Sequence, residues 1–475
     1  MMKAFKLLPL VAALALTGCM SMAPTYERPE APVSTEWPSG PAYAGAKLNQ
    51  QALPGWREYY TDKRLVTVIE TMLKNNRDLR VALLNVEKVR QAYNIQRAEF
   101  VPDVAAAGSG AHSRTSADLS STGAAYTTHA YTANLAMASY EVDLFGRIRS
   151  LSDQALNEYL ATVQAQRSAR ATLIASTANA WLKLGADESL LKFSKETLDT
   201  QKESYSLMQK SYNAGGINLL ELNQAKTAYA SAQASYSASL RAVAQDKNAL
   251  ELLVGAKVDE SLLPKEVKVV TLGGVLPAGA PSEVLLNRPD IAQAEYSLKA
   301  ANANIGAARA NFFPRITLIG TYGSGSTELD NLFDSGTRMW SFTPSVSLPL
   351  FTGGANIANL RVSEANRDIA VANYEKAIQS AFREVADAVA TEGTVEEQLK
   401  AYKDLAKASG EAYRLAKIRY RAGAESMLTL LDTQRNYVSA ESGLVNAQMA
   451  RASSLVTLYS VLGGGADADP SGEEK

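Results

Sequence analysis

Two segments of this chain recur about 210 residues later, and this repeat constrains the fold more than any other feature. The run RAEFVP at 97–102 returns as RANFFP at 309–314, and YNAG at 212–215 returns as YRAG at 420–423. Solenoid repeats recur about every 20–50 residues, so this period is too long for one. The chain therefore reads as an internal duplication of a domain-sized unit. Such a chain suits a closed, symmetric assembly better than a single active-site pocket.

Each copy contains a long segment without proline, which favours an uninterrupted helix. These segments run from 103 to 263 and from 350 to 469. In the first, leucine or tyrosine recurs every seven residues between Leu184 and Tyr212, the spacing of a coiled-coil seam. Because an α-helix rises about 1.5 Å per residue, some 65 residues span roughly 100 Å. We therefore expect a long helical hairpin at the end of each copy.

Shorter segments before the helices alternate as β-strands do. Trp340, Phe342 and other apolar residues of 340–350 fall on one face, and serines and threonines fall on the other. The first copy has similar segments at 104–115 and 127–144. Apolar-out, polar-in strands of about 10 residues fit an outer-membrane barrel, with the two aromatic residues at the membrane interface. A soluble sheet that packs them inside is the alternative. Four strands cannot enclose a lumen, because small barrels need about eight.

The N-terminus has the pattern of a lipoprotein signal peptide. Two lysines precede an apolar core at 7–16, and Thr17 and Gly18 stand before Cys19. Cys19 is the only cysteine, so no internal disulfide can form. We expect cleavage after Gly18 and lipidation of Cys19 with S-diacylglycerol and N-palmitoyl groups, which anchor a protein stably where one chain is marginal. Met20 is compatible with the outer membrane, and an ordinary buried thiol is the alternative reading.

Composition and charge argue against several classes of function. The formal net charge of −1 shows no basic excess for nucleic acid. After the first 20 residues no apolar run approaches the roughly 18 residues of a spanning helix, so any membrane crossing would use β-strands. His112 and His129 lie in the strand region without a carboxylate cluster, and we expect no metal site. No phosphate loop, cysteine pair or Ser–His constellation indicates an enzyme or a cofactor.

Five short motifs follow one another along nearly the whole mature chain. They are GWRE at 55–58, NNRDLR at 75–80, EVDLFGR at 141–147, RPDI at 288–291 and LLDTQR at 430–435. In order and spacing they resemble the outer-membrane factor family, the TolC type, and within it the OprM-like lipoprotein channels of tripartite RND drug efflux pumps. The resemblance implies a mainly α fold with some β. A homotrimer would form a twelve-stranded outer-membrane β-barrel, continued by a long periplasmic α-helical coiled-coil barrel.

The repeat and the motifs together divide the chain. We expect a signal peptide at 1–18, a lipidated extended arm at 19–55, a first repeat at 56–255, a linker at 256–284, a second repeat at 285–463 and a disordered tail at 464–475. Within the repeats, barrel strands are expected at about 103–144 and 315–351 and helical hairpins at about 147–254 and 356–462. The linker includes an expected short edge strand at 267–272.

The resemblance implies a passive exit duct for drugs and other small amphiphilic compounds, without enzymatic activity. A proton-driven RND-type inner-membrane transporter would deliver them through a periplasmic adaptor. The duct would sit in outer-membrane lipid of a Gram-negative bacterium, carry no cofactor besides the lipid on Cys19, and bind no nucleic acid. Two other functions stay open. They are a TolC-type duct for protein secretion and a non-conducting lipid-anchored periplasmic coiled-coil scaffold.

The resemblance also places functional residues at the hairpin ends. On the matching positions, the periplasmic gate consists of Leu428, Asp432 and Arg435, with Tyr420 at the turn. Their spacing puts them near one helix face, where the leucines would exclude water and the charges would tie adjacent helices. The alternative is that the charges merely solvate an exposed helix. The expected adaptor contacts are Tyr212, Gly215, Leu220, Tyr420, Gly423 and Leu428.

Overall fold

The structure is a computed structural model that describes residues 21–46, 53–273, 281 and 285–466. The chain forms two compact units, each assembled from three stretches of sequence. The sheet unit comprises the residues up to Glu30, Asn85–Thr162 and Gln293–Tyr374, and the hairpin unit comprises Ala31–Leu84, Val163–Ala292 and the residues from Glu375. The signal peptide, Cys19 and residues 467–475 of the expected tail lie outside the described residues.

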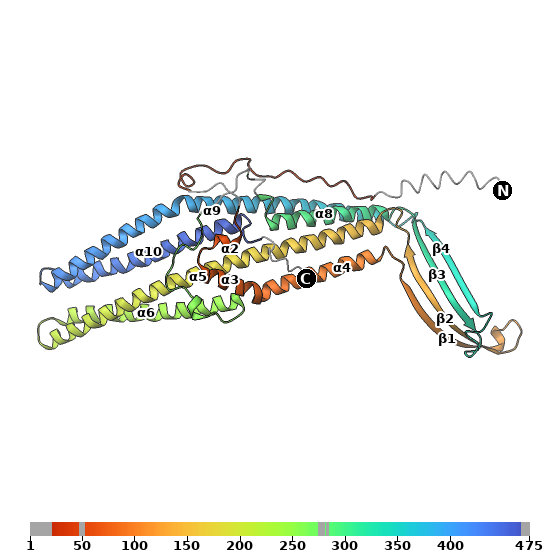
Figure 1. Ribbon diagram of the computed structural model, residues 1–475, viewed down its shortest axis with the longest axis horizontal. Helices are drawn as coiled ribbons and strands as arrows, with labels where there is room; N and C mark the ends of the chain where they lie inside the picture. Colours follow the sequence, from red (N-terminus) through yellow and green to blue (C-terminus); the bar gives the residue numbers. More distant parts are fainter. Residues whose placement is uncertain (1–20, 47–52, 274–280, 282–284, 467–475) are drawn as a thin grey trace. The chain divides into compact units, whose positions relative to one another are not determined.

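The two halves of the chain contain the same elements in the same order (Figure 1). The first half contains α4 (Arg77–Ala98), β1 (Val104–Thr115), β2 (Tyr126–Glu141), α5 (Arg147–Asn213) and α6 (Leu219–Val254). The second half contains α8 (Pro289–Ala310), β3 (Arg315–Ser326), β4 (Arg338–Ser347), α9 (Ala355–Arg421) and α10 (Met427–Val461). Helices α2 (Trp56–Tyr59) and α3 (Lys63–Asn75) precede α4, and 3-10 turns η2 (Ala117–Leu119) and η3 (Glu260–Leu262) lie in connections.

Proline and glycine set the ends of the helices. α4 and α8 end at Ala98 and Ala310, shortly before Pro102 and Pro314, which cannot continue a helix. α5 and α9 contain no proline and run without interruption for 67 residues each. Among the described helices, none is long and apolar enough to cross a membrane.

The four strands form one antiparallel sheet in chain order, β1-β2-β3-β4. Residues directly opposite one another in antiparallel strands share a face, so the pairing sorts the side chains. The apolar face carries Val104, Leu135, Met137, Leu318, Tyr322, Trp340, Phe342 and Val346. Trp340 and Phe342 are 74% and 57% exposed. The described chain therefore does not bury them inside its own sheet.

The opposite face of the sheet is polar. Three hydroxyl pairs cross between neighbouring strands there: Ser109–Thr132 at 2.7 Å, Ser113–Thr128 at 2.7 Å and Thr321–Ser341 at 2.6 Å. A bulge between Met137 and Tyr140 shifts β2 by one residue and turns Glu141 to this face, opposite Thr317. The sheet therefore has one mainly apolar face and one mainly polar face.

The arm that follows Cys19 lies against α8 within the sheet unit. Arg28 binds both carboxylate oxygens of Glu295 at 3.0 Å, and the amide of Asn302 donates to the carbonyl of Pro24 at 2.7 Å. A Cβ atom at Gly306 would stand 2.6 Å from the backbone nitrogen of Ala23. Glycine is therefore required where the arm crosses the helix, and the arm between Ala23 and Arg28 is held by specific contacts.

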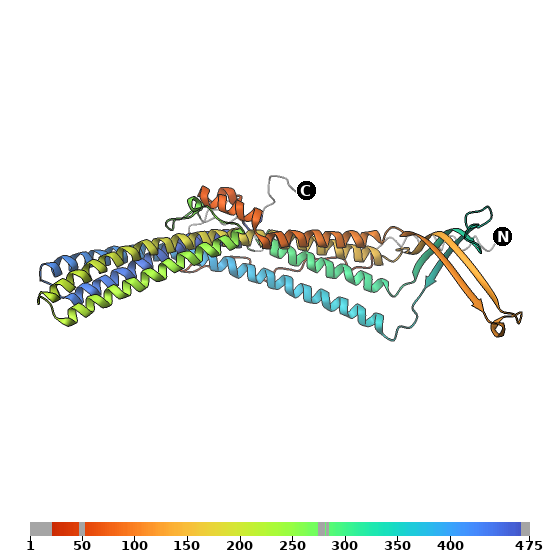
Figure 2. The ribbon, with the colours of Figure 1, turned by 90° about the horizontal axis from the view of Figure 1, so that it is seen from below.

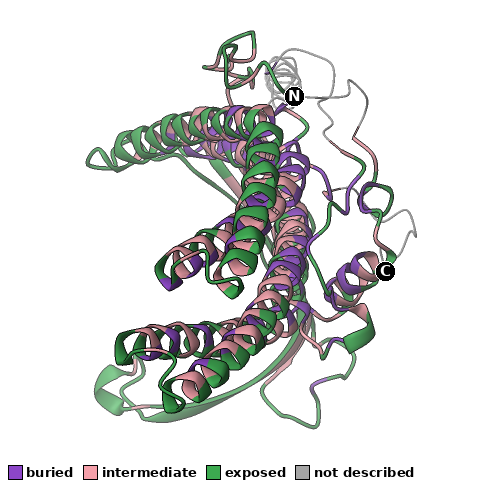
Figure 3. Cartoon of the chain, turned by 90° about the vertical axis from the view of Figure 1, so that its left-hand side faces the viewer, coloured by how far each residue is buried: buried purple, intermediate pink, exposed green. Residues whose placement is uncertain are grey.

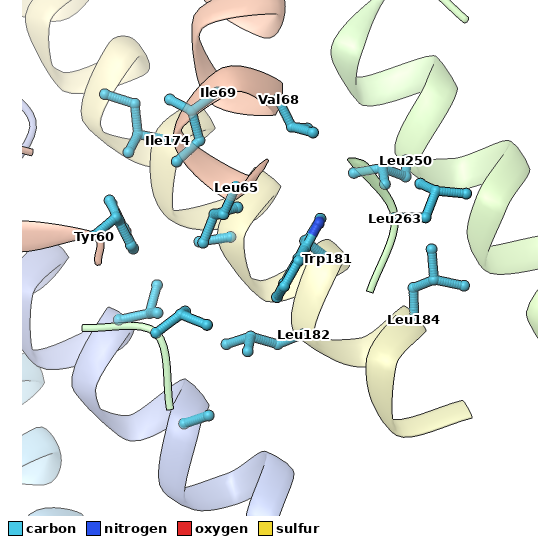
Figure 4. Packing of buried hydrophobic residues seen from close by; sticks show 14 of the residues in the cluster. Tyr60, Leu65, Val68, Ile69, Ile174, Trp181, Leu182, Leu184, Leu250 and Leu263 are labelled. Atoms are coloured by element: carbon cyan, nitrogen blue, oxygen red, sulfur yellow. The ribbon is translucent and has the colours of Figure 1, made fainter. Parts of the chain in front are cut away.

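The core of the hairpin unit gathers side chains from α3, α5, α6 and α10 with the connections around them (Figure 4). Trp181 of α5 is 1% exposed, and Leu65 of α3 and Leu250 of α6 are fully buried. The indole nitrogen of Trp181 donates to the carbonyl of Leu262 at 3.0 Å. The guanidinium of Arg64 lies 5.3 Å from the ring centroid. Trp181 thus joins apolar packing, a hydrogen bond and a cation–π contact at one position.

The long helices pair through aromatic side chains. Tyr205 of α5 stacks on Tyr229 of α6 at 5.7 Å, and Tyr413 of α9 stacks on Tyr437 of α10 at 5.9 Å. Phe193 of α5 meets Tyr437 edge-on at 5.7 Å, so the two hairpins also touch each other. Figure 2 shows these helices from a second direction.

The prediction of an edge strand at 267–272 is wrong. This segment makes a single isolated bridge, between Tyr60 and Thr271, and otherwise has no strand pairing. Val267 and Val270 are instead buried in the core of the hairpin unit. The segment is therefore a connection that packs on helices.

Candidate functional site

The candidate site comprises the two turns that close the helical hairpins, at residues 214–218 and 422–426. Gly215 and Gly423 have φ values of +77° and +73°, in the left-handed region that favours glycine. The amide of Gly216 donates to the carbonyl of Ser211 at 2.8 Å, and the amide of Ala424 donates to that of Arg419 at 2.9 Å. The two turns therefore use the same hydrogen-bonded cap.

The second helix of each hairpin, α6 or α10, begins with a side-chain cap. Asn218 accepts from the amide of Glu221 at 3.0 Å, and Ser426 accepts from the amide of Thr429 at 3.1 Å. The Glu221 side chain in turn accepts from the amide of Asn218 at 3.2 Å. The sequence therefore specifies both turns locally, without help from a partner.

We expect Gly215→Ala to lower the free energy of unfolding by about 1 kcal/mol, because an alanine at positive φ is strained. The neighbouring Gly216→Ala is a matched control. Its Cβ would meet the Ser211 carbonyl at an ordinary 3.5 Å, and its φ is not left-handed. Chemical denaturation of both variants checks the difference, and equal stabilities would contradict the assigned turn geometry.

A small apolar cluster lies directly beneath the turns and joins the hairpins. It contains Met208, Leu222, Ala225, Ala416, Met427 and Leu430. Tyr420, expected at the gate, packs on this cluster, and its hydroxyl lies 3.7 Å from the sulfur of Met208. Burial and the nearby Glu221 carboxylate raise the pKa of Tyr420. Within one chain, Tyr420 therefore fastens the second hairpin to the first.

The other three expected gate residues share one side of α10. Leu428 is 69% exposed. Arg435 donates to Asp432 of its own helix, with side chains 77% and 49% exposed. Within one chain, the two charges therefore pair with each other on α10. From the sequence, we expected them to link adjacent helices. An exposed pair contributes only about 0–1 kcal/mol, so new partners could replace it at little cost.

The turns also present apolar side chains to solvent, and Figure 3 shows the turns coloured as exposed. The turn surface consists of Leu219, Leu220, Ile418 and Leu428, which are 56%, 67%, 52% and 69% exposed. Tyr212, at the end of α5, is 37% exposed. The expected contact residues therefore lie on accessible surface in both copies, except Tyr420, which packs on the apolar cluster.

Sequence reasoning missed a charged junction where the strands meet the helices of the sheet unit. Glu141 binds Arg147 at 2.8 Å and Arg315 at 2.9 Å, and its side chain is only 15% exposed. Asp143 accepts from the amides of Ile148 and Arg149 and so caps α5. A cavity of about 250 Å³ lies beside these residues. The EVDLFGR motif was the available signal, but Arg315 is remote in sequence.

The profile of the outer membrane efflux protein family matches residues 68–256 and 280–464, most of the chain. The protein belongs to this family. The resemblance predicted from the sequence motifs is therefore confirmed, and the family model matches each half of the chain separately. As an outer membrane efflux protein, the chain belongs to the outer membrane of a Gram-negative bacterium and has a transport role.

Curated relatives and solved structures agree with this assignment. The antibiotic efflux pump outer membrane protein ArpC of Pseudomonas putida is 47% identical over 458 residues, covering 96% of this chain and 94% of that protein. The toluene efflux pump outer membrane protein TtgC of Pseudomonas putida has the same identity and coverage. The open state of the MtrE outer membrane channel of Neisseria gonorrhoeae has a TM-score of 0.84 and 38% identity, covering 94% of this chain and 99% of that chain.

The predicted function as an outer-membrane component of an efflux pump is thus confirmed at the level of the family. The mainly helical fold with some sheet is also shared with the solved channels. The gate, the adaptor contacts, the interfacial aromatic residues and the lipid on Cys19 stay predictions.

Proposed function

We propose that three copies of this chain form a passive channel that carries small amphiphilic compounds out through the outer membrane. The amphipathic four-stranded sheet supports this proposal most directly. In the described sheet, β1 and β4 each pair on one side only. Unpaired strand edges favour association with another chain, and β1 of one copy can pair with β4 of the next.

Three copies joined in this way give a twelve-stranded barrel, which exceeds the roughly eight strands that a closed barrel needs. The apolar face with Trp340 and Phe342 would face lipid, and the hydroxyl pairs would line the lumen. The helical hairpins of the repeats at 56–255 and 285–463, which we attribute to internal duplication, would continue the barrel as a pseudo-sixfold helical tunnel in the periplasm.

Exposed apolar residues on the helices also favour self-association. α4 carries Val81, Leu83, Leu84 and Ile95, whose exposed fractions lie between 52% and 73%. Apolar surface that a helix leaves exposed in this way favours contact with another chain. Neighbouring copies would cover it in the homotrimer.

The tunnel would close at the hairpin turns. Threefold symmetry would bring three copies of Leu428, Asp432 and Arg435 around one axis, where the leucines narrow the opening and the charges exchange partners between chains. The turn surface would bind a periplasmic adaptor, which connects the channel to a proton-driven RND-type transporter in the inner membrane.

The cargo follows from the relatives, whose names specify antibiotics and toluene. Drugs and other small amphiphiles fit a barrel lumen lined by hydroxyl groups. The channel would perform no catalysis and need no cofactor besides diacylglycerol and palmitoyl groups on Cys19. A duct for protein secretion and a non-conducting lipid-anchored scaffold are the alternatives.

We expect deletion of this protein to make its host more sensitive to antibiotics and toluene, and re-expression of the full chain to restore tolerance. Growth inhibition by a panel of both compound types measures this, with an empty vector as control. Loss of a secreted protein at unchanged tolerance would favour the secretion duct. Unchanged tolerance and secretion would favour the scaffold.

A further inference from the structure

The only two histidines of the chain face each other across adjacent strands of the sheet. His112 of β1 lies directly opposite His129 of β2. Their Nδ1 atoms are 2.5 Å apart, and their ring centroids are 4.8 Å apart. From the sequence, we placed both histidines in the strand region and expected no metal site, because no carboxylate cluster lies near them. The contact between the two rings depends on the strand register, which the sequence did not specify.

The two histidines lie near the loop end of the sheet, beside one further aromatic ring. The ring of Tyr131 meets His112 edge-on at 5.3 Å. His112 is three residues from the end of β1, beside the connection at 116–125, and both histidines are exposed. Arg114 is the next residue on the same face. Its positive charge disfavours a cation moderately, because exposed charges are strongly screened.

The contact directs ring nitrogen lone pairs at one point. At most one of the two facing nitrogens can carry hydrogen, because two N–H groups cannot point at each other. When both rings are neutral with hydrogen on the outer nitrogen, both Nδ1 atoms become donors to a metal. Imidazole is the commonest protein ligand for Cu²⁺, Ni²⁺ and Zn²⁺.

The geometry needs only a small adjustment. Metal–nitrogen bonds of about 2.0–2.1 Å place two nitrogens on one ion about 3 Å apart. The rings must therefore separate by about half an ångström, which exposed side chains achieve by rotation. Among the described residues, no three side chains of the His, Cys, Asp and Glu types gather at one point. Water would therefore complete the coordination.

We propose that His112 and His129 form a cross-strand binding site for a divalent transition metal, with Cu²⁺ bound most tightly. A bound ion would join β1 to β2 near the loop end of the apolar face. The site depends only on the β1–β2 register and not on transport activity.

Copper titration of the full-length lipidated protein, purified in detergent without a polyhistidine tag, tests the site. We expect one Cu²⁺ per chain, with an electron paramagnetic resonance spectrum showing two coordinated nitrogens. Because a second ligand on the same hairpin binds intramolecularly, His112→Gln or His129→Gln should weaken binding about tenfold or more and leave one nitrogen. Ni²⁺ and Zn²⁺ should bind more weakly than Cu²⁺.

A neighbouring pair on the opposite face provides the control. Ser113→Ala with Thr128→Ala removes a hydroxyl contact at 2.7 Å and should leave copper affinity and the spectrum unchanged. The proposal is overturned if the unmodified protein at saturating copper shows no two-nitrogen spectrum. It is equally overturned if the double variant His112→Gln/His129→Gln binds copper as tightly as the unmodified protein. The copper spectrum is recorded on the unmodified protein, so that test does not depend on whether a variant folds.

Discussion

Replacing Trp181 by alanine is expected to lower the free energy of unfolding by about 3–5 kcal/mol. The side chain is 1% exposed, so its removal leaves a cavity that the surrounding helices close only in part. The same change leaves the carbonyl of Leu262 without the indole donor at 3.0 Å. It also removes the ring beneath the guanidinium of Arg64.

Denaturant unfolding followed by circular dichroism measures the loss. Trp181→Phe is the conservative comparison, because it keeps an aromatic ring and loses the indole hydrogen bond. Its expected loss is about 1–3 kcal/mol, the range for a buried acceptor left unpaired. An alanine variant as stable as the unmodified protein would refute the position of Trp181 at the centre of this core.

Removing Arg451 is expected to have an effect of similar size. Glu392 of α9 is 1% exposed at its side chain and binds Arg451 of α10 at 2.7 Å, while Arg451 also binds Glu396. Arg451→Met leaves the buried carboxylate without its charged partner, which typically lowers the free energy of unfolding by about 3–5 kcal/mol. Glu392→Gln in the same chain should restore much of the loss, because the amide carries no charge.

The loss of folding stability in the Arg451→Met variant should depend on pH. Burial raises the pKa of Glu392 above its ordinary value of 4.5, and Arg451 opposes this rise. A group with a raised pKa contributes stability below its unfolded pKa and loses that contribution as pH rises through the folded pKa. Arg451→Met raises the folded pKa further, so the variant should lose more stability at about pH 8 than at about pH 5. Equal losses at both values, or no rescue by Glu392→Gln, would contradict a charged buried pair.

Local sequence patterns predicted most of the secondary structure well. Prolines at 102 and 314 and glycines at 215 and 423 mark the ends of helices, because these residues restrict or permit particular φ angles wherever they occur. The proline-free segments predicted long helices of some 65 residues, and α5 and α9 have 67 residues each. The strand predicted at 267–272 is absent because Val267 and Val270 are buried in the helical core and the segment makes only one isolated bridge.

Interactions between distant residues were beyond local signals. The register of β1 on β2 determines the contact between His112 and His129, and no single segment specifies that register. Glu392 and Arg451 meet only because α9 and α10 pack along each other. At the turns, the glycines and leucines were predictable from the repeat. The position of Tyr420 on the cluster with Met208 required the packing of one hairpin on the other.

Single-channel conductance in a planar lipid bilayer tests the central claim, a conducting trimer closed at α10. Purified trimers of the unmodified chain should give small, infrequent steps. Asp432→Ala with Arg435→Ala should give larger or more frequent steps, because the closing charges are lost. Gln224→Ala with Thr227→Ala, at the matching positions of the first copy, should behave as the unmodified chain. The claim is contradicted if none of the three proteins conducts, or if the control opens as readily as the charge variant.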